Sequence, residues 1–161
     1  MNSQYELAAE LKTWIKAYSQ TDATHNSMCK IKDVRIGWAD YQQLAHGSPI
    51  ASISNGAEIL GKTKPERKPY QYNYILDFYF LIHGDPEFTE HHLCDCVDRF
   101  RDYFIAHPQM YLKSVAEGGV AAKNIYLTIC TDIGAVKTLK LDTGNYCKSR
   151  SMNISLYEFG M

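Results

Sequence analysis

The run of residues 70–83 alternates its side chains over more positions than an ordinary β-strand contains. Successive side chains of a strand point to opposite faces, and aromatic and β-branched residues suit such a pleated surface. One face of the run is aromatic and aliphatic: Tyr70, Tyr72, Tyr74, Leu76, Phe78, Phe80 and Ile82. The other carries Gln71, Asn73, Asp77 and His83, with Ile75, Tyr79 and Leu81 between them. The pattern predicts one long strand.

A strand of this length exceeds what its own sheet normally requires. At about 3.3 Å per residue the run reaches roughly 45 Å, whereas a typical strand spans about 20 Å. A strand that extends past its sheet usually needs another surface to pair with. We therefore expect this run to take part in contacts between subunits.

Length and charge restrict the class of protein. A chain of 161 residues is predicted to form a single domain, 1–161, with a core that needs neither disulfides nor metal. The net charge of −1 argues against a protein whose main role is to coat nucleic acid, because such binding uses many Lys and Arg residues in excess. No apolar run approaches the ~20 residues that cross a bilayer, and the N-terminus lacks a secretory pattern, so we expect no membrane contact.

The cysteines are odd in number and lack the paired spacing of a zinc ribbon or finger. They are Cys29, Cys94, Cys96, Cys130 and Cys147. We expect reduced, mostly buried thiols in a protein assembled in a cytosol.

Periodicity and turn residues predict the order helix, three strands, helix, three strands. The expected helices cover residues 3–19 and a segment that starts at Pro86 and ends before Pro108; the expected strands cover 30–38, 50–60, 70–83, 124–131, 136–141 and 146–159. Residues 109–122 give a weak signal and are expected to form a loop. The predicted fold class is α+β: an antiparallel β-sheet with two helices packed on one face and a long protruding β-hairpin over residues 50–83.

Residues 90–96 hold the densest group of potential metal ligands. His91 and Asp95 lie four apart on the predicted helix, as do His92 and Cys96, so either pair alone could share a metal ion. The two pairs point about 100° apart, and no second cluster supplies the remaining ligands. We therefore expect no metal site and no cofactor, and a half-exposed first turn of an amphipathic helix.

Sequence motifs of catalysis are missing. There is no Gly-x-Ser-x-Gly elbow, and no cysteine lies in a context that marks an activated thiol. Neither Asn55-Gly56 nor Gly118-Gly119 is expected to form a phosphate-binding loop. We expect that the chain is not an enzyme, although a site assembled from distant residues would leave no such motif.

The connection between the second and third predicted strands is basic. Lys62, Lys64, Arg67 and Lys68 are offset only by Glu66. Such a loop can contact an acidic partner surface or nucleic-acid phosphates. Taken alone, the charge pattern favours a solvated turn in which Lys and Pro discourage wrong strand pairing.

The layout resembles the tail terminator (tail completion) proteins of tailed bacteriophages. The resemblance spans most of the chain and rests on an N-terminal amphipathic helix, a hairpin with a long loop over 50–83, a Gly-Asp-Pro-Glu start of the second helix, and a last strand ending at 153–159. The apolar residues of that first helix are Leu7, Leu11, Trp14 and Ile15. The extra length around 109–122 and the further hairpin at 136–159 depart from the family layout.

The resemblance implies a structural virion protein without catalytic residues. Such proteins form a ring, usually a hexamer, at the head-proximal end of the tail tube, stop tube polymerisation and present a docking surface for the neck or connector. Viral DNA passes through the ring. The implied partners are other copies of the chain, the tail tube protein, the neck or connector protein and, transiently, DNA; assembly would occur in the host cytoplasm.

Two sets of residues are candidates for these contacts. Tyr70, Tyr72 and Tyr74 are candidates for the subunit interface, because aromatic residues concentrate at interface cores; alternatively, they cover the helices. Lys62, Lys64, Arg67 and Lys68 are candidates for the ring lumen or the partner ring.

Two other functions remain open at this stage. One is a different neck or head-completion protein, and the other is a small-ligand-binding protein or enzyme with a pocket under the sheet. The mass of the protein in solution separates a ring from a monomer that holds a metabolite.

Overall fold

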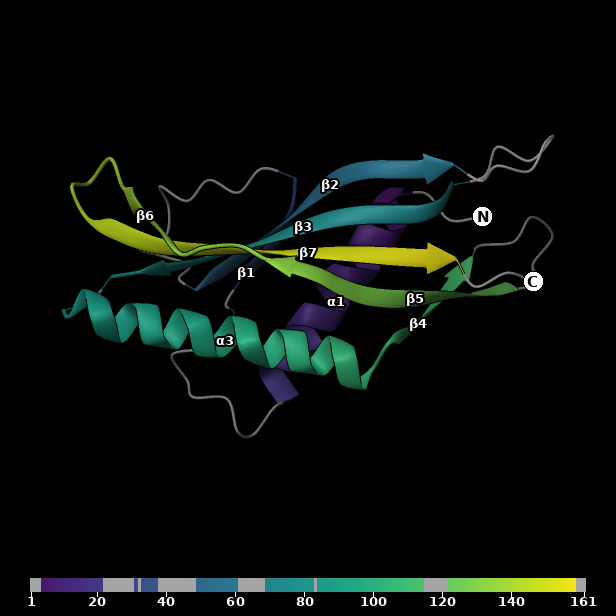
Figure 1. Ribbon diagram of the computed structural model, residues 1–161, viewed down its shortest axis with the longest axis horizontal. Helices are drawn as coiled ribbons and strands as arrows, with labels where there is room; N and C mark the ends of the chain where they lie inside the picture. The colour runs from purple at the N-terminus through teal and green to yellow at the C-terminus, as the bar shows by residue number, and fades with distance from the viewer. Residues whose placement is uncertain are drawn as a thin grey trace.

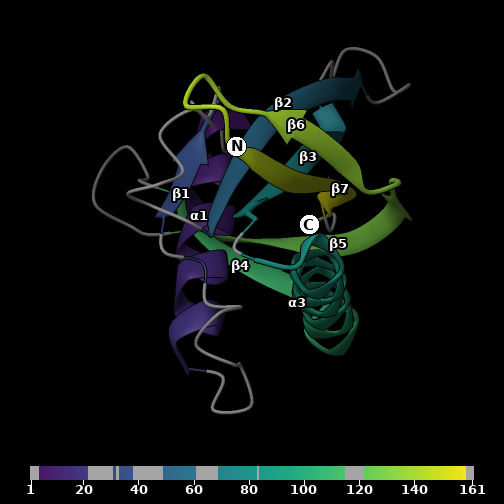
Figure 2. The same ribbon diagram turned by 90° about the vertical axis from the view of Figure 1, so that its left-hand side faces the viewer.

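A mostly antiparallel sheet carries two helices on one of its faces (Figures 1 and 2). The computed structural model describes residues 4–21, 31, 33–37, 49–60, 69–82, 84–114 and 122–158. The elements are α1 (Gln4–Thr21), β1 (Asp33–Ile36), β2 (Ile50–Leu60), β3 (Pro69–Leu81), α3 (Pro86–Ala106), β4 (Gln109–Ser114), β5 (Ala122–Ile133), β6 (Lys137–Lys140) and β7 (Tyr146–Glu158). The predicted α+β class, with both helices on one face, is confirmed.

The strands follow the order β1-β2-β3-β7-β5-β4, and the short β6 pairs with β7. All pairings are antiparallel except that of β1 with β2, which is parallel. The expectation of a purely antiparallel sheet is therefore wrong at this edge. Strand direction depends on the path of the chain between β1 and β2, and side-chain alternation carries no information about that path.

The long strand β3 lies in the middle of the sheet rather than beyond it. Its residues pair with β2 along one edge, and each residue from Gln71 to Leu81 also has a partner on β7 along the other. The expectation that this strand overshoots its sheet is therefore wrong, and the long protruding hairpin is not confirmed. The strand is long because β7, with 13 residues, is equally long.

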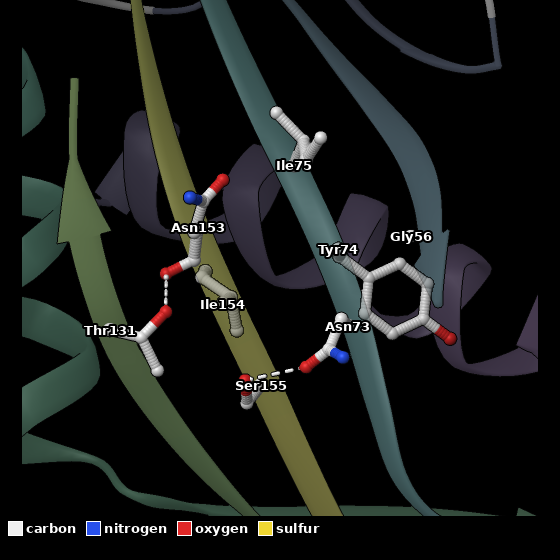
Figure 3. Close-up of a pocket in the computed structure, with 8 residues that line it drawn as sticks. All are labelled: Gly56, Asn73, Tyr74, Ile75, Thr131, Asn153, Ile154 and Ser155. Atoms are coloured by element: carbon white, nitrogen blue, oxygen red, sulfur yellow. Dashed lines mark hydrogen bonds between the residues drawn. The ribbon is translucent and has the colours of Figure 1, made fainter. Parts of the chain in front are cut away.

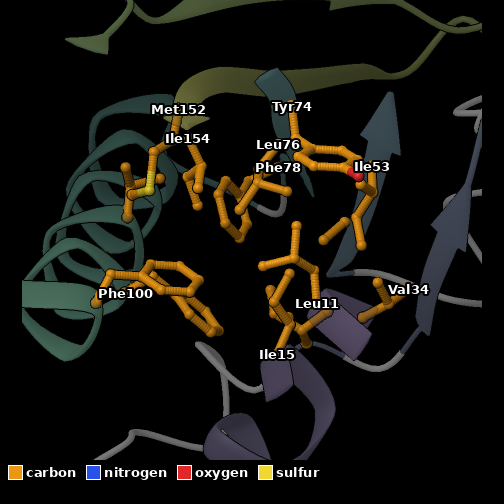
Figure 4. Packing of buried hydrophobic residues seen from close by; sticks show 14 of the residues in the cluster. Leu11, Ile15, Val34, Ile53, Tyr74, Leu76, Phe78, Phe100, Met152 and Ile154 are labelled. Carbon is orange, nitrogen blue, oxygen red and sulfur yellow. The ribbon is translucent and has the colours of Figure 1, made fainter. Parts of the chain in front are cut away.

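The core lies between the sheet and the helices (Figure 4). Leu7, Leu11 and Ile15 of α1 recur at helical spacing, and all three are buried. In α3 the buried stripe is Leu93, Cys96, Val97, Phe100 and Phe104. Both stripes meet the even-numbered residues of β3, with the Phe78 and Phe100 rings stacked at a centroid distance of 5.3 Å.

The second helix begins and ends as predicted. The Asp85 side chain accepts a hydrogen bond from the Glu87 backbone N–H, and Pro86 occupies the first turn, where it displaces no helical hydrogen bond. Arg99 Nε lies 3.0 Å from Asp95 Oδ2, as their spacing of four residues predicts. The helix ends at Ala106, two residues before Pro108.

Residues 109–122 contain a strand that the sequence analysis missed. β4 pairs with β5 from Gln109 to Ser114, and the Thr128 N–H donates to the Pro108 carbonyl at 2.6 Å. The expectation of a loop is wrong for this part of the segment. An edge strand is held by backbone hydrogen bonds to its neighbour, which need no strong pattern of apolar side chains.

Candidate functional site

The face of the sheet turned away from α1 and α3 is the candidate functional surface, and we call it the open face. From Gln71 to Phe80 the buried residues of β3 have even numbers, so the odd-numbered side chains point to the open face. At the end of the strand Leu81 is buried on that same side, in a small second apolar cluster with Ile50, Leu141 and Cys147. The middle of the open face is made of neighbouring positions on four strands: Ser52 and Ser54; Gln71, Asn73, Ile75 and Asp77; Ser151, Asn153 and Ser155; and Ile129, Thr131 and Asp132.

Small polar side chains form a hydrogen-bonded network across the two central strands. Ser155 Oγ donates to Asn73 Oδ1 at 2.7 Å, and Gln71 Nε2 donates to the same oxygen at 3.0 Å. Two rows further along the pair, the Ser151 hydroxyl donates to the Asp77 carboxylate. These bonds hold the polar side chains of β3 and β7 in fixed positions on the sheet.

A pocket of about 280 Å³ opens on this surface (Figure 3). It is lined by Gly56, Asn73, Tyr74, Ile75, Thr131, Asn153, Ile154 and Ser155. The Tyr74 and Ile154 side chains belong to the helix-covered core, so we expect these two residues to contribute backbone to the floor. The pocket is thus a depression lined by both polar and apolar groups, with Ile75 as an aliphatic wall.

Two irregularities in strand pairing lie at the edges of the pocket. The register of β2 against β3 shifts between Asn55 and Glu58, and that of β5 against β7 shifts between Cys130 and Asp132. Both shifts occur beside the same short stretch of the central pair. β-Bulges often re-aim side chains next to functional sites, and here the second bulge places Thr131 at the pocket, with its hydroxyl donating to the Asn153 carbonyl at 3.3 Å.

Gly56 is required at the first bulge for reasons of space. A Cβ atom at this position would lie 2.9 Å from the Asn73 carbonyl oxygen, which is closer than side chains approach backbone. The absence of a side chain lets β2 approach β3 where the register shifts.

The open face carries two exposed isoleucines and two carboxylates. Ile75 and Ile129 are 39% and 40% exposed, respectively. Asp132 is exposed and lies opposite Asn153, and Asp77 lies opposite Ser151 one step away. Arg35 is also on this side of the sheet, but its guanidinium pairs with Asp33 at 2.8 Å and, through this bond, lowers the pKa of the Asp33 carboxyl.

Two of the three tyrosines predicted at the subunit interface are buried within the chain itself. Tyr72 and Tyr74 are each 1% exposed and belong to the core under the helices. The structure places both where the alternative interpretation had them, covering the helices, because interface cores and protein cores select the same aromatic residues. Tyr70 is a residue of β3, and its side chain lies outside the described part of the structure.

The basic residues Lys62, Lys64, Arg67 and Lys68 fall in residues 61–68, outside the described ranges. The possible ligand pairs on α3 do not converge: within the part of the chain that the structure describes, no three His, Cys, Asp or Glu side chains come together as a metal site. Nor does either helix, within the same ranges, have the length and apolar character to cross a bilayer.

Burial favours the protonated form of two of the described thiols, Cys130 and Cys147. Burial raises the pKa of Cys147 to about 11 and also raises that of Cys130. Both therefore remain protonated near neutral pH, when a nucleophilic cysteine would need to be a thiolate.

The sequence analysis did not identify the pocket residues. A signal was present, since residues 149–155 place Ser149, Ser151, Asn153 and Ser155 at every second position, and such spacing marks one face of a strand. The bulge at Thr131 has no comparable signal. No protein family model matches this sequence, and no curated protein shows a significant match to it.

Proposed function

We propose that this chain is a structural virion protein of the tail terminator type. It would form a ring at the head-proximal end of a phage tail tube, end tube polymerisation and join the tail to the neck or connector, with viral DNA passing through the opening. The proposal starts from the resemblance of the sequence layout to that family.

One observation carries the proposal: the layering is one-sided. Both helices pack on the same face of the sheet, whereas the middle of the open face has exposed isoleucines among polar side chains, of which Asp77 and Asp132 are acidic. Exposed apolar groups within a polar surface suit contact with another protein. A ring of identical subunits needs such a surface on every copy.

We therefore propose that the subunit contacts involve the open face rather than the tyrosines or the edges of β3. β3 has partners on both sides, and Tyr72 and Tyr74 are core residues. A second surface is the outer edge of β2 beyond Ile53: β1 pairs only with the first four residues of β2, and no other described strand pairs with this edge. Free strand edges accept strands of other chains.

The test is the state of the purified full chain. Native mass spectrometry is expected to show a closed oligomer, and negative-stain electron microscopy is expected to show rings with a central opening. Added to polymerising tail tubes, the protein is expected to shorten the tubes in proportion to its concentration. A stable monomer that leaves tube length unchanged would exclude this function, and a monomer that retains a tightly bound metabolite would favour a ligand-binding protein with its site at the open-face pocket.

A further inference from the structure

The pocket on the open face extends across four neighbouring strands (Figure 3). Neighbouring strands lie about 4.8 Å apart, so three spacings give the pocket a length of about 14 Å. It is therefore long enough to hold more than one polar group of a ligand. Besides backbone of Tyr74 and Ile154, its described lining comes from β2, β3, β7 and β5 in that order: Gly56; Asn73 and Ile75; Asn153 and Ser155; and Thr131.

The side-chain amide of Asn73 is held in one orientation. Its Oδ1 accepts hydrogen bonds from Ser155 Oγ at 2.7 Å and from Gln71 Nε2 at 3.0 Å, which together occupy both lone pairs of this oxygen. Ser155, which provides the shorter bond, is only 4% exposed. The Asn73 amide nitrogen lies on the side away from Ser155 (Figure 3) and makes no hydrogen bond to any described residue. Its two N–H groups are thus presented to an acceptor on a ligand.

The neighbouring strands β7 and β5 provide acceptors as well as donors. Within the described ranges the side-chain amide of Asn153 makes no hydrogen bond, so its carbonyl and its two N–H groups are all available. Thr131 Oγ donates its proton to the Asn153 backbone carbonyl at 3.3 Å and keeps its lone pairs. The pocket therefore combines donors on β3 with both donors and acceptors on the strands beside it.

The chemistry of the lining favours an uncharged ligand. None of the eight described residues that line the pocket is charged, so a phosphate or carboxylate would find no counter-charge among them. The Tyr74 ring is buried in the core and offers no surface on which a nucleobase could stack. Ile75 and Ile129, on different strands, are 39% and 40% exposed and offer aliphatic surface to the carbon atoms of a ligand.

Phosphate is disfavoured for a second reason. Residues 56–63 have the spacing Gly-x-x-x-x-Gly-Lys-Thr of a phosphate-binding loop, which leads from a strand into a helix. Here residues 56–60 belong to β2, and the next described element is β3, a strand that returns antiparallel to β2. The spacing therefore does not make the Gly56 side of the pocket a nucleotide site.

An amide group meets these requirements. It is uncharged, and in a trans peptide its carbonyl and its N–H point in opposite directions, so it can bridge two side chains. Asn73 and Asn153 are diagonal neighbours on the open face, because Asn73 pairs with Ser155 and Asn153 pairs with Ile75. Diagonal neighbours lie about 7 Å apart, which leaves room for one peptide group between the two asparagine side chains.

We propose that the pocket binds an amide whose carbonyl accepts from Asn73 Nδ2 and whose N–H donates to Asn153 Oδ1. In the proposed ring, on which this assignment rests, the amide belongs to the backbone of the neighbouring copy, because the subunit contacts of that ring involve the open face of every copy. Carbon atoms on either side of the amide pack on Ile75 and Ile129.

Asn73→Asp in the full chain tests the donor and keeps the network. The carboxylate retains an oxygen for Ser155 and Gln71 but replaces the N–H donors by a second acceptor. Assembly in native mass spectrometry is expected to weaken at least about tenfold, because two acceptors then face each other. Asn145→Asp, the same change of charge in the exposed turn between β6 and β7, is the control and should leave the oligomer intact. Asn153→Leu removes the second amide without adding charge, and it provides the test if Asn73→Asp unfolds the chain.

A small diamide measures the site independently of assembly. N-Acetylalanine N′-methylamide is uncharged and contains two peptide groups. Added to the isotope-labelled full chain, it is expected to shift the side-chain NH₂ signals of Asn73 and Asn153 in NMR spectra and to leave that of Asn145 unchanged. The three signals are identified by their loss in the three variants. Sodium acetate and glucose, a carboxylate and a polyol, should shift the signals less at equal concentration.

The outcomes separate the amide site from the proposed function. If the chain is monomeric at every concentration but the diamide shifts both signals, the ring and its neighbouring copy are wrong and the amide site stands. If rings form and both variants weaken them while Asn145→Asp does not, the full inference holds. If rings form and neither variant weakens them, the assignment to the neighbouring copy is overturned. Unchanged assembly of the variants together with no shift by the diamide, or larger shifts with acetate or glucose, overturns the amide site itself and leaves the ring standing.

Discussion

The two faces of β3, formed by alternate residues of one strand, differ in what their side chains contact. Towards the helices the strand presents Tyr72, Tyr74, Leu76, Phe78 and Phe80, all buried against α1 and α3. Towards the open face it presents Gln71, Asn73, Ile75 and Asp77, which are partly or largely accessible. The helix-covered face is closed by apolar packing, whereas the open face is ordered by hydrogen bonds and keeps surface for contact.

The alternation of side chains along a strand determines which residues share a face. It does not determine what packs on that face. In the helix-covered face, aromatic rings meet other rings from the same chain, as Phe78 meets Phe100. In the open face, the apolar side chains Ile75 and Ile129 stand among polar neighbours. A second copy of the chain is one covering that would complete the open face in the same way as the helices complete the other.

The largest loss of unfolding free energy is expected from truncating Leu76, which points to the helix-covered face. Its neighbour Ile75 points to the open face and provides the comparison. Leu76→Ala removes a fully buried side chain and is expected to cost about 2–5 kcal/mol of unfolding free energy, through lost burial and a cavity. Ile75→Ala, the next residue on the same strand, should cost no more than about 1 kcal/mol in the monomer. Urea unfolding measures both, and equal losses would contradict the assignment of faces.

The bulge at Gly56 is expected to be the next most sensitive position. Gly56→Ala places a Cβ against the Asn73 carbonyl and forces the strands apart, at a cost of about 1–3 kcal/mol. At about 2–4 °C per kcal/mol for a chain of this size, the melting temperature should fall by several degrees. Gly134→Ala is the matched control, because the nearest atom to its Cβ would be 3.8 Å away. Equal behaviour of the two variants would show that the close approach is absent.

Much of the fold was predictable because its signals are local. Helical spacing of apolar residues predicted α1, and Asp85-Pro86 predicted the start of α3, since capping involves only neighbours in sequence. The partners of β3 were not predictable in this way. Residues 146–159 were predicted to be a strand of similar length, but nothing in its alternation says that it pairs with β3 along the whole edge.

The candidate site was less predictable than the fold. The expected interface tyrosines are core residues because aromatic alternation is the same pattern for either role. The pocket depends on two shifts of register, of which only Asn55-Gly56 was visible as an interruption of its strand. The shift at Thr131 arises from the pairing of β5 with β7, which lie far apart in sequence.

The capped end of α3 provides a smaller effect on the helix-covered side. Asp85→Ala removes the acceptor for the Glu87 N–H and is expected to cost about 1 kcal/mol. Asp85→Asn is the control, since its side-chain oxygen accepts the same bond and asparagine caps as well as aspartate. Thermal unfolding should rank the alanine variant below both the asparagine variant and the unaltered chain. If asparagine and alanine are equally destabilising, charge rather than capping is responsible.

The ion pair at the edge of the open face should contribute least. The bond from Arg35 lowers the pKa of Asp33 below its ordinary value of 3.8, so the pair stabilises the fold above that pH, and its contribution disappears as the pH falls through the lower, folded-state pKa. Both side chains are more than a third exposed, and solvent screening limits the effect to a few tenths of a kcal/mol, about the median for surface pairs.

Asp33→Asn is therefore expected to be slightly destabilising in urea unfolding at pH 7, with a loss that shrinks as the pH is lowered below 3.8. Arg35→Gln should behave in the same way, and the double variant should add nothing further at pH 7, because either change already removes the pair. Losses that add, or that persist at low pH, would mean that Asp33 and Arg35 each contribute through other contacts. In that case packing would hold the side chains of the open face in place, as it does on the helix-covered face. The two faces would then differ less in the interactions that stabilise them.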